Sequence, residues 1–139
     1  GFTILEAIAS VFIITLVLTT AMTIILTMRN HARRTEEKIN ATDVGSLIRF
    51  DLEKNYSYEN IEAWLNGNQE MITYENCESS LISCDVFDHQ ANNLDYSSLI
   101  TITFLAQSAQ AIEYRIIHFE IEIVYYKEQS VILVGVIYA

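Results

Sequence analysis

A single carboxylate lies in the most apolar part of this sequence. Glu6 is the only charged side chain among residues 1–28, and no charge or proline interrupts the run from Ala7 to Met28. An ionised carboxylate inside a membrane-spanning helix costs about 3 kcal/mol or more, so it is tolerated where it is paired or functional. No basic residue lies within a helical turn of Glu6. An α-amino group near the chain start is therefore the partner that we expect; a carboxylate at the membrane surface that meets water is the alternative.

The two cysteines are the next residues that could do chemistry. Cys77 and Cys84 lie close together in a stretch rich in serine and glutamate. In an exported protein, such a pair indicates a disulfide. Two free thiols are the alternative, whereas a zinc site needs more ligands than these cysteines and His89 can offer. We expect a disulfide between Cys77 and Cys84, and no metal site or cofactor.

Residue patterns of catalytic sites are missing from the sequence. No serine or cysteine lies in a nucleophile motif, and there is no glycine-rich phosphate loop. The three histidines are scattered along the chain: His31, His89 and His118. The acids Glu120, Glu122 and Glu128 fit the solvated face of a strand. The sequence thus predicts a protein that is not an enzyme.

The net charge of −10 belongs entirely to the second part of the chain. Up to Lys54, six acids balance six bases, whereas after Lys54 twelve acids face only Arg115 and Lys127. This acidic part of the chain, called the head below, repels phosphate backbones, which argues against direct nucleic-acid binding by the head. A solvated, soluble surface is the simple interpretation of this charge. A surface for a protein partner or a cation is the alternative.

One long helix must carry Glu6. The apolar run to Met28 is long enough to span about 30 Å of hydrocarbon. It continues into an amphipathic pattern with apolar residues at helical spacing: Ala41, Val44, Ile48 and Leu52. We therefore expect one continuous helix from about Phe2 to about Lys54, roughly 80 Å long. Half of such a helix has to be buried in lipid or against other copies of itself.

The remaining sequence predicts a small antiparallel sheet. A turn is expected at Asn66–Asn68, followed by a short strand at Met71–Tyr74. The polar stretch Asn76–Ser98 is expected to be a loop around the cysteines. Three stronger strands are expected, and the last is predicted to be the most deeply buried: Leu99–Leu105, Ile112–Tyr126 and Val131–Tyr138. Short hairpin links are expected at Gln107–Gln110 and Lys127–Ser130.

These signals predict an α+β fold in which the long N-terminal helix packs on the sheet. They divide the chain into three parts. Residues 1–28 form the hydrophobic, transmembrane or filament-core half of the helix, residues 29–55 its amphipathic half, and residues 56–139 the acidic, β-rich head.

The first six residues, Gly1-Phe2-Thr3-Ile4-Leu5-Glu6, together with the apolar helix, resemble the N-terminus of type IV pilins and type II secretion pseudopilins. The resemblance covers roughly Gly1 to Arg34. It implies a pilin-like fold and a basic leader that a prepilin peptidase removes after Gly1. It also implies that Phe2 becomes the N-methylated mature terminus. Glu6 would then be the assembly glutamate, paired with the Phe2 amine of an adjacent subunit.

Two further features resemble the J-type minor pseudopilins and the competence minor pilins: the segment Leu47–Glu53, and Phe104 followed by Ile112–Tyr114. The resemblance implies a minor structural subunit of a pilus-like filament, serving adhesion, DNA uptake or secretion. Its partners would be other pilin subunits, with the cell membrane before assembly and an extracellular or periplasmic filament after it. The alternatives are a major pilin and a single-pass membrane-anchored binding domain that does not polymerise.

Overall fold

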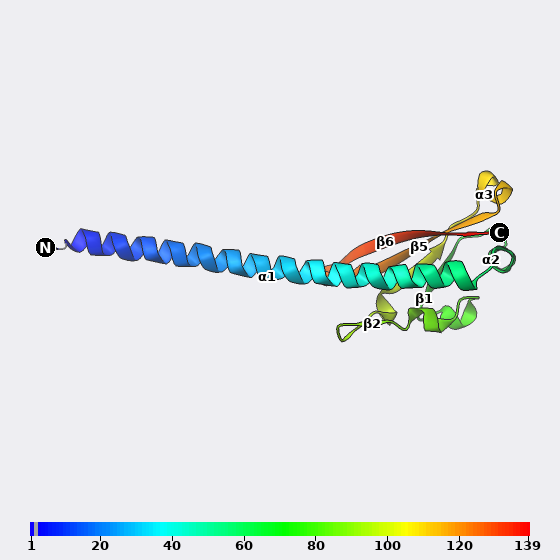
Figure 1. Ribbon diagram of the computed structural model, residues 1–139, viewed down its shortest axis with the longest axis horizontal. Coiled ribbons are helices and arrows are strands. Elements are labelled where there is room, and N and C mark those ends of the chain that lie inside the picture. The colour runs from blue at the N-terminus through cyan, green and yellow to red at the C-terminus, as the bar shows by residue number, and fades with distance from the viewer. Residues whose placement is uncertain (2) are drawn as a thin grey trace. The chain divides into compact units, whose positions relative to one another are not determined.

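The computed structural model describes residues 1 and 3–139. Helix α1 (Ile4–Asn55) is unbroken, as the sequence predicts, and is coloured from blue to green in Figure 1. It passes through two compact units, Gly1–Glu36 and Glu37–Ala139. The expected helix start at Phe2 lies outside the described residues, and the predicted boundaries after residues 28 and 55 stay predictions.

The second unit holds a four-stranded antiparallel sheet in the order β1-β4-β5-β6. Its strands are β1 (Glu70–Thr73), β4 (Ile100–Phe104), β5 (Ile116–Tyr125) and β6 (Gln129–Tyr138). Ile102 lies opposite Ile72 on one side and Ile121 on the other, so these side chains share one face of the sheet. The C-terminal half of α1 packs on this face. The predicted α+β class, a long helix on a small antiparallel sheet, is therefore confirmed.

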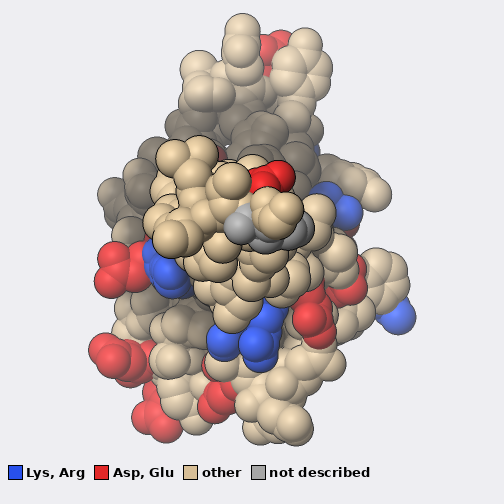
Figure 2. Space-filling view, turned by 90° about the vertical axis from the view of Figure 1, so that its left-hand side faces the viewer, with Lys and Arg blue, Asp and Glu red and all other residues tan. Residues whose placement is uncertain are grey.

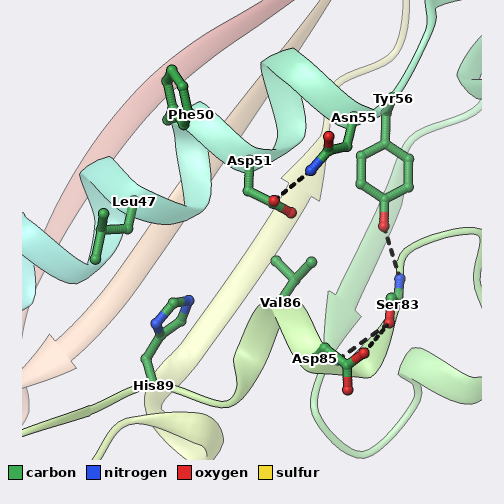
Figure 3. Close-up of a pocket in the computed structure, with 9 residues that line it drawn as sticks. All are labelled: Leu47, Phe50, Asp51, Asn55, Tyr56, Ser83, Asp85, Val86 and His89. Atoms are coloured by element: carbon green, nitrogen blue, oxygen red, sulfur yellow. Dashed lines mark hydrogen bonds between the residues drawn. The ribbon is translucent and has the colours of Figure 1, made fainter.

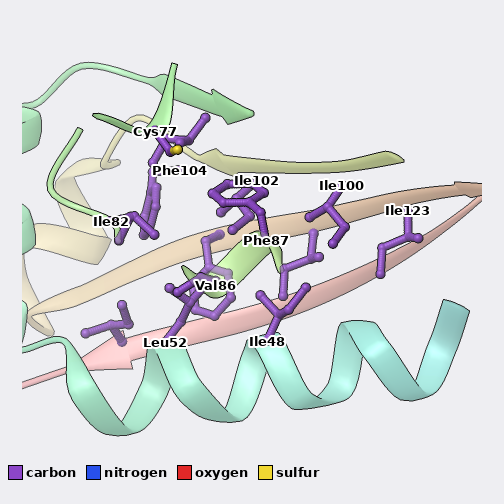
Figure 4. Packing of buried hydrophobic residues seen from close by; sticks show 14 of the residues in the cluster. Ile48, Leu52, Cys77, Ile82, Val86, Phe87, Ile100, Ile102, Phe104 and Ile123 are labelled. Carbon is purple, nitrogen blue, oxygen red and sulfur yellow. The ribbon is translucent and has the colours of Figure 1, made fainter. Parts of the chain in front are cut away.

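The core of the second unit lies between α1 and the sheet. The helix contributes the apolar stripe that the sequence predicts, and all four members are buried: Ala41, Val44, Ile48 and Leu52. The strand β5 contributes alternate residues, again as predicted: Phe119, Ile121, Ile123 and Tyr125. Figure 4 shows Ile48 and Leu52 pointing from the helix into the layer of buried side chains. The helical and strand periodicities therefore point to one common core.

The predicted deep burial of the last strand is wrong. In β6, the side chains of Ile132 and Val134 are 57% and 54% exposed. Within the part of the chain that the structure describes, β6 pairs with β5 alone, so it is an edge strand. The helix covers only one face of the sheet, and Ile132 and Val134 lie on the other, opposite Glu122 and Glu120. An unbroken apolar run therefore did not mean burial on both faces.

Two short helices were not predicted. Helix α2 (Tyr58–Leu65) buries Tyr58, Ile61 and Leu65 and ends at Asn66, whose φ of 47° begins the expected turn. Helix α3 (Ala109–Glu113) is capped by Ser108, whose hydroxyl accepts a hydrogen bond from the N–H of Ala111. This cap replaces the predicted Gln107–Gln110 hairpin link, so the strand expected from Ile112 begins only at Ile116.

The polar stretch Asn76–Ser98 is more than a loop. It contains the 3₁₀ turns η1 (Cys77–Ser79), η2 (Cys84–Phe87) and η3 (Ser97–Leu99), and a small hairpin of β2 (Gln90–Ala91) and β3 (Leu94–Asp95). It buries four large side chains: Ile82, Val86, Phe87 and Tyr96. The predicted disulfide is confirmed, with the Cα atoms of Cys77 and Cys84 5.3 Å apart. The hairpin between β5 and β6 is confirmed, but its link is η4 (Tyr126–Glu128) and not the expected Lys127–Ser130, because Gln129 and Ser130 already pair with β5.

Candidate functional site

Among its described residues, the first unit has no core of its own, and its surface is largely apolar up to residue 28, where the charged stretch 29–36 begins. Every described side chain from Gly1 to Glu36 is exposed, and the large apolar ones range from Ile4 at 83% to Leu26 at 49%. The most apolar 18-residue window of α1 has a mean hydropathy of 2.4, so by length and composition this helix is a candidate single membrane span. Figure 2 views the protein from its N-terminal end, where the nearest surface is uncharged except for one acidic group. This surface is suited to an apolar medium.

The hydroxyl groups of this helix are satisfied by the helix itself. Each of the following residues donates its side-chain hydroxyl to a backbone carbonyl three or four residues earlier, at 2.8 to 3.0 Å: Ser10, Thr15, Thr19, Thr20, Thr23 and Thr27. In hydrocarbon, an unsatisfied polar group costs several kcal/mol, by order of magnitude. The threonines therefore do not oppose burial of the helix in lipid or among other apolar helices.

Glu6 takes part in a cap at the start of α1. Its backbone N–H donates to the carbonyl oxygen of Thr3 at 3.1 Å and to the Thr3 hydroxyl oxygen at 3.3 Å. In return, the backbone N–H and the hydroxyl of Thr3 both donate to Oε2 of Glu6 at 3.5 Å. This reciprocal pattern is a capping box, and its sequence signal is Thr-x-x-Glu. The sequence interpretation missed this role, although Thr3-Ile4-Leu5-Glu6 carries the signal.

The cap leaves the Glu6 carboxylate with unused capacity for hydrogen bonds and ion pairs. Both hydrogen bonds to Oε2, at 3.5 Å, are weak, because they are longer than the usual range of about 2.5–3.2 Å, and the side chain is exposed. Within residues 1 and 3–139, no basic side chain forms an ion pair with it. A negative charge in the first turn is favoured by the helix dipole, but by a small amount compared with the cost of an unpaired charge in hydrocarbon. Glu6 can therefore take a further cationic partner.

The structure says little about the two residues that the resemblance assigns to processing, Gly1 and Phe2. Gly1 is exposed. Phe2, for which the resemblance implies cleavage and N-methylation, lies outside the described residues, so both roles stay predictions.

In the second unit, the disulfide anchors a polar segment to the core. Cys77 is buried, and Ile82, inside the loop that the disulfide closes, is also buried. The bond thus restrains Cys84 and the turn η2 that begins there. Among residues 1 and 3–139, no group of three histidine, cysteine, aspartate or glutamate side chains is placed to hold a metal ion.

Comparison of this chain with protein-family models, with curated proteins and with solved structures found no match.

Proposed function

We propose that this chain is a structural, minor subunit of a type IV pilus-like filament. It is inserted in the cell membrane as a precursor, cut after Gly1 by a prepilin peptidase, and then assembled through the first unit into an extracellular or periplasmic filament. The observation that carries the proposal is that Glu6 is the only ionisable side chain among residues 1–28, where the helix surface is exposed and apolar and the hydroxyls from Ser10 to Thr27 are satisfied by the helix backbone.

The physical argument concerns where the charge of Glu6 is tolerated. In lipid, the ionised side chain is costly. Among packed helices of several copies, the amino group of a neighbouring Phe2 can lie beside it, and the attraction is strongest where water is excluded. Apolar side chains around it, such as Ile4, Leu5 and Ile8, offset the loss of contacts with lipid. The pairing therefore favours the filament over the isolated subunit and sets the register between copies.

The capping box favours a second candidate, a single-pass membrane-anchored domain. In that case, Glu6 serves only to start the helix, because Thr3 and Glu6 satisfy each other's backbone N–H groups. The two candidates differ in what they require of Glu6. A cap needs a hydrogen-bond acceptor at this position, which glutamine also provides, whereas pairing with an amine needs the negative charge.

The experiment uses that difference. The full chain is expressed in cells that assemble the filament, and its amounts in membranes and in sheared filaments are measured. Glu6→Gln keeps the cap and removes the charge. Thr3→Ala removes the cap's hydroxyl and keeps the charge. We expect Glu6→Gln to stay in the membrane at wild-type amounts and to disappear from filaments, whereas Thr3→Ala enters filaments.

Normal incorporation of Glu6→Gln would contradict the pairing role of Glu6. Absence of the wild-type chain from sheared filaments, with normal amounts in the membrane, would favour the anchored domain instead.

A further inference from the structure

A groove in the second unit lies between α1 and the segment that follows the disulfide. It has a volume of about 520 Å³ and is lined by residues of both: Leu47, Phe50, Asp51, Asn55, Tyr56, Ser83, Asp85, Val86 and His89. In Figure 3, Leu47 and Asp51 point from the helix toward the segment that carries Val86 and His89. The volume is within the range of about 300–1,000 Å³ that is common for binding pockets.

The groove combines an apolar surface with two carboxylates. Leu47 and Phe50 are 59% and 62% exposed beside it, although they lie on the helix that supplies the core. The carboxylates belong to Asp51, which accepts a hydrogen bond from the Asn55 amide at 2.6 Å, and Asp85, which accepts one from the Ser83 hydroxyl at 3.2 Å. Within the described chain, neither carboxylate has a cationic partner.

The groove is held in shape by the fold. The hydroxyl of Tyr56 accepts a hydrogen bond from the backbone N–H of Ser83 at 3.0 Å, which ties the end of α1 to the segment across the groove. Ser83 caps η2 by accepting from the N–H of Asp85, and Val86 in the same turn is buried. The disulfide at Cys84 lies between Ser83 and Asp85 in the sequence and restrains both. The two carboxylates are therefore presented on restrained backbone.

We propose that this groove binds the basic segment Leu26–Arg34 of a second copy of this chain. The inference rests on the proposed filament function, which brings copies side by side, and it names a contact beyond the pairing of Glu6. Charge selects this occupant. The segment holds Arg29, Arg33 and Arg34, three of the chain's eight basic residues. After Lys54 the sequence holds only Arg115 and Lys127 as basic residues, so positive charge is densest in this segment.

The chemistry of the two surfaces matches. Leu26, Arg29 and Arg33 are three and four residues apart, so they share one face of their helix, and all three are exposed. The leucine of this face meets Leu47, while Arg29 meets Asp51. Guanidinium groups suit this role, because their planar fork binds a carboxylate with two hydrogen bonds and loses less hydration than an ammonium.

The test is a charge exchange in the full chain in filament-forming cells. Asp51→Lys or Arg29→Glu alone should lower the amount in sheared filaments by at least about tenfold, because each places like charges in contact. The double variant, Asp51→Lys with Arg29→Glu, should recover to within about twofold of wild type, since it restores an opposite pair. Glu113→Lys makes the same charge change at an exposed head residue outside the groove, and should assemble normally.

A cross-linking measurement makes the result independent of assembly. Asp51→Cys and Arg29→Cys are placed in separately tagged copies and treated in intact membranes and filaments with a short bismaleimide. We expect a product that joins the two tags, and none when Glu113→Cys replaces Asp51→Cys. No joined product, a product with a different protein, or wild-type assembly of Asp51→Lys would overturn the inference, while normal filaments would leave the proposed function standing.

Discussion

The described side chains of residues 1–36 are all exposed, whereas residues 37–139 bury apolar side chains from helix, strands and turns around one core. Both regions contain residues of the same helix, α1. Its N-terminal part is apolar on every side, and its C-terminal part has a single apolar stripe that meets the sheet. A helix that is apolar on every side needs apolar surroundings on every side, whereas an amphipathic helix needs only one apolar partner surface. The first segment is therefore suited to burial by other molecules, whereas the second buries its own apolar stripe.

The two units also differ in how their side-chain hydroxyl groups are hydrogen-bonded. In the first unit, the hydroxyls of Thr15, Thr19, Thr20, Thr23 and Thr27 donate to the helix backbone, and that of Thr3 donates to the Glu6 carboxylate. In the second unit, the fully buried Tyr96 carries a hydroxyl with no hydrogen-bond partner in the part of the chain that the structure describes. A helix in an apolar medium has no water as a substitute partner. Folding of the second unit tolerates such losses, because the hydrophobic burial in its core outweighs their cost.

The largest expected effect comes from comparing a phenylalanine in each unit. Phe119 is fully buried, contacts Phe104 with ring centroids 5.7 Å apart, and covers Gly135, where an added Cβ would overlap its ring. Phe119→Ala should lower the free energy of unfolding of the head by about 3–5 kcal/mol, since it leaves a cavity. Phe12→Ala should leave the head's stability unchanged, because Phe12 is exposed.

The measurement is denaturant unfolding of the full chain in detergent, followed by the fluorescence of Trp64, which is the only tryptophan and contacts Phe104 in the core. Equal shifts of the midpoint in both variants would show that the two units do not differ in the way described here.

A smaller effect is expected from the disulfide. Replacing both Cys77 and Cys84 by serine should destabilise the head by about 2–3 kcal/mol, because the short closed loop no longer restricts the unfolded chain. Membrane insertion of α1 should not change, since the bond lies in the second unit. Thermal unfolding with and without a reductant measures the first expectation, and membrane fractionation the second. A reduced wild-type protein as stable as the oxidised one would contradict the prediction.

The smallest effect concerns the hydroxyl groups. Tyr96→Phe should stabilise the head by about 1 kcal/mol, since it removes a buried hydroxyl without a partner. Burial raises the pKa of Tyr96 and the nearby Glu37 carboxylate adds to this. The stability linked to Tyr96 is therefore complete below the usual tyrosine pKa of about 10 and falls as the pH rises through the raised value.

The difference in the free energy of unfolding between Tyr96→Phe and the wild type should therefore grow above about pH 10. The exposed Tyr74, changed to phenylalanine, is the control for this titration. Thr23→Val should leave insertion unchanged, because its hydroxyl is satisfied within the helix. A constant difference across the alkaline range would show that Tyr96 does not titrate as its surroundings imply.

Several features could be predicted because they depend on local patterns. The helical spacing of Ala41, Val44, Ile48 and Leu52 and the alternation in β5 each fix one buried face, since side-chain direction follows directly from the backbone period. The disulfide followed from two nearby cysteines. The position of Glu6 as one charge in an apolar run is readable directly from the sequence, and its assembly role stays a prediction. Its capping role was also readable from Thr3, and α2 from the spacing of Tyr58, Ile61 and Leu65.

The sequence by itself determined that α1 has two differently built halves, that one half carries a lone carboxylate, and that the acidic charge lies in the head. Only the tertiary structure decided that β6 is an edge strand with exposed aliphatic side chains, and that a polar segment after the disulfide supplies Val86 and Phe87 to the core. It also decided that Asp51 and Asp85 line one groove. The physical reason is that periodicity specifies which side chains share a face, whereas what covers that face depends on segments distant in the chain.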